Sequence, residues 1–96
     1  MIVEFSVTPI GSGVSVGKYV AKAVQIVHDS GLKYELNPMG TVVEGSWDDV
    51  MAVIKKCNDQ LLKDCERLSI AIKIDSRRGK SPPMGDKVRS ILRRLR

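Results

Sequence analysis

Two stretches of the chain alternate apolar and polar residues one by one, and this spacing is typical of half-buried β-strands. Over residues 2–10, every second position from Val3 to Val7 is apolar. Pro9 is expected to end the hydrogen bonding of this strand, because proline has no N–H to donate. Residues 68–74 repeat the alternation with one leucine and three isoleucines, so a second long strand is predicted there.

Two shorter strands are predicted on either side of a turn. Residues 32–36 and 41–44 contain β-forming side chains, and the segment Asn37-Pro-Met-Gly40 between them is rich in turn residues. Because the connection is short, the two strands are expected to pair antiparallel, as in a hairpin.

Three stretches space their apolar residues three and four positions apart, which predicts helices with one apolar face. The first covers residues 16–28, with Ser15 as its N-cap and Gly31 placed to end it. The second begins after the capping residue Ser46, and the third covers residues 84–95.

The predicted order of elements is βαββαβ followed by one further helix. This is the pattern of an α+β, ferredoxin-like sandwich with a four-stranded antiparallel sheet, in which the first strand lies between the third and the fourth. Residues 1–96 are expected to form one such domain. The two longer helices should cover one face of the sheet and bury Val3, Phe5, Val7, Ile70, Ile72 and Ile74. The other face should carry Glu4, Ser6, Thr8, Ala71, Lys73 and Asp75, with Glu44 among them.

Composition narrows the class of protein. The chain is 43% hydrophobic and 28% charged, which is close to the average of globular proteins. Two cysteines and one histidine make a disulfide scaffold or a zinc site a poor explanation, and no nucleophile–base pair stands out. No apolar run approaches the roughly 20 residues of a membrane span, and Met1–Phe5 does not resemble a signal peptide. We therefore expect a soluble cytoplasmic protein that is not an enzyme and holds no metal or cofactor.

Positive charge is concentrated at the end of the chain. Residues 77–96 hold eight Lys/Arg and one acid, a net charge of +7, whereas residues 1–76 carry −2. Such a block favours phosphates, nucleic acid or an acidic partner, unless it is simply the solvated face of the last helix. Nucleic-acid binding is the alternative function, but the sheet offers only Phe5 for stacking, and Phe5 is expected on the helix side.

Four segments of the chain can be compared with known families: Glu4–Gly11, Tyr34–Thr41, Val43–Gly45 and Ile72–Asp75, the last followed by Arg77. Together they resemble the small thiamine-binding protein family. The resemblance extends over nearly the whole chain. It implies a ferredoxin-like fold that binds thiamine or its hydroxymethylpyrimidine part without catalysis, and it implies sheet-mediated dimers that pair into tetramers. Association also has a physical motive, because a single sheet with helices on one side leaves its other face uncovered.

The ligand that the resemblance implies can be compared with the available side chains. Thiamine has an aminopyrimidine and a cationic thiazolium, so its site needs a carboxylate, hydroxyls or amides, and an apolar or aromatic surface. Glu44 is the first candidate carboxylate and Thr41 the first hydroxyl. Each candidate also has a structural explanation, such as an ion pair, strand packing, a turn filler or a lid on a helix. The candidate ligand-binding residues are Ser6, Thr8, Tyr34, Met39, Thr41, Glu44 and Trp47.

Overall fold

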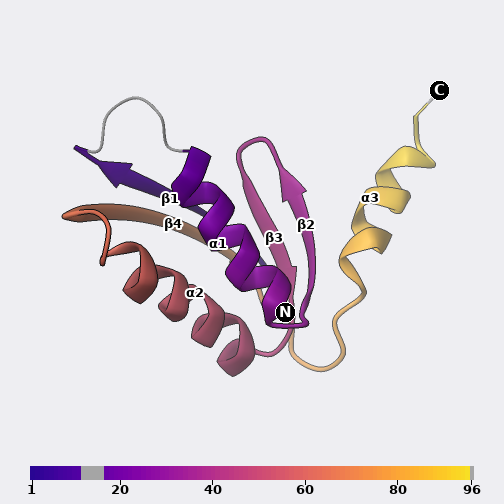
Figure 1. Ribbon diagram of the computed structural model, residues 1–96. Helices are drawn as coiled ribbons and strands as arrows, with labels where there is room; N and C mark the ends of the chain where they lie inside the picture. Colours follow the sequence, from indigo (N-terminus) through magenta and orange to yellow (C-terminus); the bar gives the residue numbers. More distant parts are fainter. Residues whose placement is uncertain (12–16, 96) are drawn as a thin grey trace.

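The computed structural model describes residues 1–11 and 17–95, and its elements follow the predicted order. The strands pair antiparallel in the order β2-β3-β1-β4, and α1 and α2 pack on one face of the sheet (Figure 1). The predicted α+β, ferredoxin-like architecture is therefore confirmed. The elements are β1 (Ile2–Ile10), α1 (Gly17–Asp29), β2 (Lys33–Asn37), β3 (Gly40–Glu44), α2 (Trp47–Leu61), β4 (Arg67–Asp75) and α3 (Met84–Leu92).

The ends of the helices follow from capping chemistry. The Ser46 hydroxyl accepts a hydrogen bond from the backbone N–H of Asp49 at 3.1 Å, as predicted for the start of α2. Gly31 adopts a φ of 77°, a conformation that suits glycine and turns the chain after α1. The predicted cap Ser15 lies outside the described residues. Within residues 1–11 and 17–95, no helix is long and apolar enough to cross a membrane.

The core lies between the helix-covered face of the sheet and the two helices. Val3, Phe5 and Val7 of β1 are buried there, as predicted, and Ile70 is partly buried against them. The expectation that Ile72 and Ile74 are buried is wrong, since their side chains are 42% and 37% exposed. The physical reason is their place in the sheet. β4 is an edge strand, so its outer side has no neighbouring strand to cover these side chains.

The strand predicted over residues 2–10 is confirmed as β1, but Pro9 does not end its pairing, contrary to expectation. β1 continues to Ile10, and Pro9 lies opposite Leu68 of β4. The pairing with β3 covers only Ile2 to Phe5, so the second half of β1 has a neighbouring strand on one side alone. A residue without an N–H is tolerated where one side of the strand has no partner. The same arrangement leaves space beside β1.

The last helix is not part of the two layers. A long connection leads to α3 from the end of β4 (Figure 1). Lys87 of α3 shares a hollow with Glu4, Val42 and Lys73 of the sheet. Met84 is buried at its start, and an ion pair joins Lys87 to Asp75. The predicted helix to residue 95 ends at Leu92 in the structure. Its apolar stripe is 53–66% exposed and consists of Val88, Ile91, Leu92 and, beyond the helix, Leu95.

Candidate ligand-binding cavity

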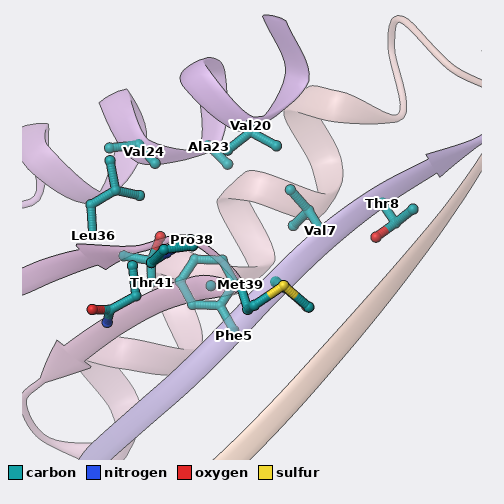
Figure 2. A pocket seen from close by; sticks show the side chains of 13 residues that line it. Phe5, Val7, Thr8, Val20, Ala23, Val24, Leu36, Pro38, Met39 and Thr41 are labelled. Carbon is teal, nitrogen blue, oxygen red and sulfur yellow. The ribbon is translucent and has the colours of Figure 1, made fainter. Parts of the chain in front are cut away.

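A cavity of about 260 Å³ lies between α1 and the sheet, next to the turn from β2 to β3 (Figure 2). It exists because β3 pairs with β1 only as far as Phe5, leaving no strand beside residues 6–8 on this side. Figure 2 shows the side chains of α1 facing those of β1 and the turn across this space. The walls come from residues 5–8 of β1, Val20, Ala23 and Val24 of α1, and residues 36–41.

Gly40 allows the turn to approach β1 closely. A Cβ atom at this position would lie 3.0 Å from the carbonyl oxygen of Phe5 and 3.4 Å from Cγ of Glu4. Any side chain would therefore push the turn away from the backbone of β1. The close approach holds the neighbouring residues Met39 and Thr41 at the wall of the cavity.

The cavity is mainly apolar and has few polar groups. Phe5 and the valines of α1 belong to its apolar walls, and no charged side chain of the described residues lines it. Thr41 is 6% exposed and is the one buried polar side chain among the described residues. The Asn37 amide and the β1 backbone groups that point away from β4 add hydrogen-bonding capacity. Such a surface suits a flat, uncharged ring that makes a small number of directed hydrogen bonds.

Ser6 and Thr8 contribute to the cavity differently from Phe5. They lie opposite Ala71 and Ser69 of β4, and the alternation of the strand turns their side chains toward the helix-free face. Ser6 also lines a small hollow on that face. We infer that these two residues border the cavity chiefly through the free backbone edge of β1.

A second, more open groove continues from the cavity along α1. This α1–β2 groove shares Val20, Val24 and Leu36 with the cavity, and it also carries His28 and Tyr34. Nδ1 of His28 and the hydroxyl of Tyr34 are 3.0 Å apart, and the two rings meet edge to face with centroids 5.9 Å apart. The groove therefore adds an aromatic surface and polar atoms at one end of an apolar cavity.

The structure brings together some of the predicted ligand-binding residues and not others. Ser6, Thr8, Met39 and Thr41 line the cavity, and Tyr34 lines the adjoining groove. Glu44 and Trp47 line neither.

These two residues belong to the far end of β3. Glu44 lies opposite Ile2, and its carboxylate is 3.9 Å from Nζ of Lys33. Trp47 begins α2 and is 55% exposed. Their predicted role in ligand binding stays a prediction.

Several lining residues were not predicted from the sequence. The sequence predicts Phe5 in the core. It also predicts that the apolar face of the helix over residues 16–28, which includes Val20 and Val24, packs against the sheet. A valine that lines a cavity and a valine that fills a core have the same helical spacing, so no sequence signal separates them. The turn residues Asn37, Pro38 and Gly40 were recognised as a connection, but their contact with β1 depends on the fold.

The cysteines show no sign of nucleophilic chemistry at the cavity. Burial raises the pKa of the Cys57 thiol to about 11, and its Sγ lies 3.7 Å from the Ala23 carbonyl oxygen. A thiol with so high a pKa stays protonated at neutral pH. Within the described part of the chain, no three His, Cys, Asp or Glu side chains are grouped as a metal site.

Fold and cavity together define a small ferredoxin-like domain with a ring-sized, uncharged hollow beside its central strand. The profile of the thiamine-binding protein family matches residues 3–92, and the chain belongs to that family. A UPF0045 protein of Mycobacterium bovis is 41% identical over 96 residues, covering 99% of this chain and 94% of the relative. A UPF0045 protein of Methanocaldococcus jannaschii is 37% identical over 91 residues, covering 95% of this chain and 91% of the relative.

Solved structures show the same fold. A crystal structure of a hypothetical protein from Methanocaldococcus jannaschii matches with a TM-score of 0.87 at 38% identity, covering 94% of this chain and 93% of that chain. A domain of unknown function from Bacillus cereus matches with a TM-score of 0.82 at 31% identity, covering 91% of this chain and 85% of that chain.

Proposed function

We propose that this chain binds thiamine or a related hydroxymethylpyrimidine compound without transforming it, as a homo-oligomeric carrier or sensor in the cytoplasm. The observation that carries the proposal is the uncharged cavity beside β1, with the ring of Phe5 and the buried Thr41 in its walls. Membership of the thiamine-binding protein family supports the choice of ligand. Two free cysteines, Cys57 and Cys65, suit a reducing compartment.

The size of the cavity favours the pyrimidine as the group it encloses. Pockets for drug-sized ligands usually measure roughly 300–1,000 Å³, so a cavity of about 260 Å³ suits one ring with its substituents. The pyrimidine is flat and uncharged. Its amino group and ring nitrogens would meet the Thr41 hydroxyl, the Asn37 amide and the free edge of β1, and its ring would lie against Phe5.

The cationic thiazolium would then extend into the α1–β2 groove. No charged side chain of the described residues lines the cavity, so a permanent cation buried there would have no counter-charge. The groove begins at the residues that both spaces share, and it presents the ring of Tyr34. An aromatic face stabilises a cation while leaving it in contact with water.

The proposal includes the claim that the bound ligand is not chemically converted. Among the described residues that line the cavity and the groove, His28 is the one imidazole, and its ring contacts Tyr34 in the groove. This arrangement offers the enclosed ring neither a nucleophile nor a general base.

Isothermal titration calorimetry with thiamine, its phosphates and hydroxymethylpyrimidine tests the ligand, and thermal shifts give an independent readout. Val24→Phe fills the cavity and should abolish binding of every compound while leaving the melting temperature of the free protein nearly unchanged. Thr41→Val keeps the shape but removes the hydroxyl, so affinity should fall by about three- to tenfold. Glu44→Ala and Trp47→Ala are the matched controls outside the cavity.

The outcomes of these experiments show where on the protein the ligand binds. If Val24→Phe binds like wild type while Glu44→Ala or Trp47→Ala abolishes binding, the site lies at the far end of β3 and the cavity is not used. Tyr34→Ala should weaken thiamine more than hydroxymethylpyrimidine, whereas Tyr34→Phe retains the ring and should bind both. A response to short RNA alone, lost at higher salt, would instead support the alternative function of the basic terminal segment.

A further inference from the structure

The hydrogen bonds between β1 and β3 show which backbone groups of β1 point toward the cavity. Met1 and Gly45 exchange two backbone hydrogen bonds, one in each direction, at 2.9 and 3.0 Å. Along an antiparallel pair, opposite residues that exchange both bonds alternate with opposite residues that exchange none. Because the register continues without a shift, Val3 and Phe5 also turn their N–H and C=O toward β3. The residues between them turn these groups toward β4.

Val7 is the next residue of β1 in this series, and β3 does not reach it. The pairing of β1 with β3 stops at Phe5 and Thr41. Among residues 1–11 and 17–95, no hydrogen bond joins the backbone N–H or C=O of Val7 to another residue. Val7 is nevertheless only 7% exposed, and it lines the cavity (Figure 2). Buried backbone groups are almost always paired, so a buried donor and acceptor at a cavity wall point to a ligand that pairs with both.

We propose that the N–H and C=O of Val7 together bind the edge of a heterocycle on which a ring nitrogen lies next to an exocyclic amine. The N–H donates to the ring nitrogen, and the C=O accepts from the amine. The ligand then takes the place of the missing residue of β3, which would have exchanged the same two bonds. The inference rests on the proposed function, because the aminopyrimidine of thiamine carries such an edge, and it names the group of the protein that recognises this edge.

An extended peptide fits this part of β1 less well. Phe5 is already paired with Thr41, and Pro9, the next residue whose backbone faces away from β4, has no N–H. Within residues 6–10 the free edge therefore offers a single donor, at Val7. A peptide that adds to a sheet gains its affinity from a series of backbone hydrogen bonds. One donor with one adjacent acceptor suits a small ring instead.

Recognition by Val7 makes the amine of the ligand the main determinant of specificity. A ring of the same size with a methyl group in place of the amine would set that methyl against the Val7 carbonyl oxygen. A buried acceptor without a partner is costly, so such a ring should bind weakly even though it fits the space. The Thr41 hydroxyl and the Asn37 amide remain available for the other polar atoms of the ligand.

Amide hydrogen exchange followed by NMR tests the contact without changing the protein. In the free protein, the Val7 amide should exchange faster than the amides of Phe5 and Thr8, which are paired within the sheet. Saturation with hydroxymethylpyrimidine should slow exchange at Val7 by about tenfold more than at Thr8. Thr8 is the internal control, because ligand binding stabilises the whole fold and slows every amide that exchanges through global unfolding.

Two analogues of hydroxymethylpyrimidine test the role of the amine. Replacing the amine by a methyl group keeps the size of the ring but removes the donor, and affinity in calorimetry should fall about tenfold. Replacing the hydroxymethyl group by a methyl group keeps the amine and gives the matched control compound. The control compound should still slow exchange at Val7 more than at Thr8.

A pair of variants tests the same contact from the side of the protein. Val7→Pro removes the backbone N–H, and affinity for hydroxymethylpyrimidine should fall by about tenfold or more in the folded chain. Val7→Ala shortens the side chain but keeps the N–H, so it should still prefer the ligand with the amine over the analogue without it. Thermal melting shows whether Val7→Pro folds, and the exchange experiment on the wild type decides where it does not.

The outcomes separate this inference from the proposed function. If hydroxymethylpyrimidine binds in calorimetry but slows exchange at Val7 and Thr8 by the same factor, Val7 does not contact the ligand, and the proposed function stands without this contact. Equal affinities for the ring with the amine and the ring with the methyl group lead to the same conclusion. If neither thiamine nor hydroxymethylpyrimidine binds, the proposed function and this inference are both overturned.

Discussion

Gly40 is the residue on which the shape of the cavity depends most directly. Gly40→Ala would bring a Cβ to 3.0 Å from a backbone carbonyl oxygen of Phe5, so either the turn or β1 must move. We expect the free energy of unfolding to fall by about 1–3 kcal/mol, the usual cost of overpacking. Urea denaturation measures this change in the free energy of unfolding. Gly17→Ala is the control, because its added Cβ meets no heavy atom within 4 Å. Its free energy of unfolding should stay the same or rise slightly. Equal losses of stability in the two variants would contradict the role given to Gly40.

Cys57 gives the molecule a predictable response to alkaline pH. Its pKa is about 11 in the folded state against 9.0 ordinarily, because burial disfavours the thiolate. Between these values the unfolded chain releases the proton and the folded chain keeps it, so the free energy of unfolding falls as the pH rises. Between pH 9 and 11, the thiol should lower the free energy of unfolding by about 1 kcal/mol per pH unit.

Urea titrations from pH 8 to pH 11 measure this contribution. Other groups titrate in the same range, so the informative quantity is the difference in slope between wild type and Cys57→Ala. The variant should be less stable at pH 8, because it leaves a small void, but it should lose less stability on going to pH 11. Parallel slopes would show that the thiol does not stay protonated in the folded state.

Thr41 and Glu44 show what the sequence reveals about the site and what it does not. They are three positions apart on one strand, so alternation alone places them on opposite faces. Thr41 lies at the turn and lines the cavity, whereas Glu44 lies at the other end of β3 beside Lys33. Both residues were candidates from their side chains alone, since Thr41 has a hydroxyl and Glu44 a carboxylate. Only the strand direction and the start of β3 beside Phe5 decide which of the two residues lies at the cavity.

At the scale of elements, local patterns predicted every helix and strand, and tertiary arrangement decided their surroundings. The period-two spacing in β4 correctly predicts a strand with an apolar face, but that spacing is the same in an edge strand and in a central strand. Ile72 and Ile74 are exposed because β4 is at the edge, a fact of sheet order. The cavity also depends on the arrangement of the strands in the sheet. β1 is four residues longer than β3, and the unmatched part of its edge is one wall of the hollow.

At the scale of the whole molecule, apolar side chains are exposed in several places among the described residues. Two of these places are the edge of β4 and the stripe on α3. The proposed homo-oligomer needs at least one surface on which two copies meet. The exposed stripe of α3 is an apolar surface of the kind that marks contacts between proteins. We therefore expect the stripe to take part in the proposed self-association.

Ile91→Glu places a charge in the middle of the α3 stripe and should lower the oligomeric state of the chain in sedimentation velocity experiments. The melting temperature of the dissociated chain should change little, since Ile91 is 56% exposed within one copy. Arg93→Glu adds negative charge just beyond the end of the same helix, away from the stripe, and should leave the association unchanged. If Ile91→Glu associates as the wild type does, α3 takes no part in assembly, and the stripe must be covered by something other than a second copy of this chain.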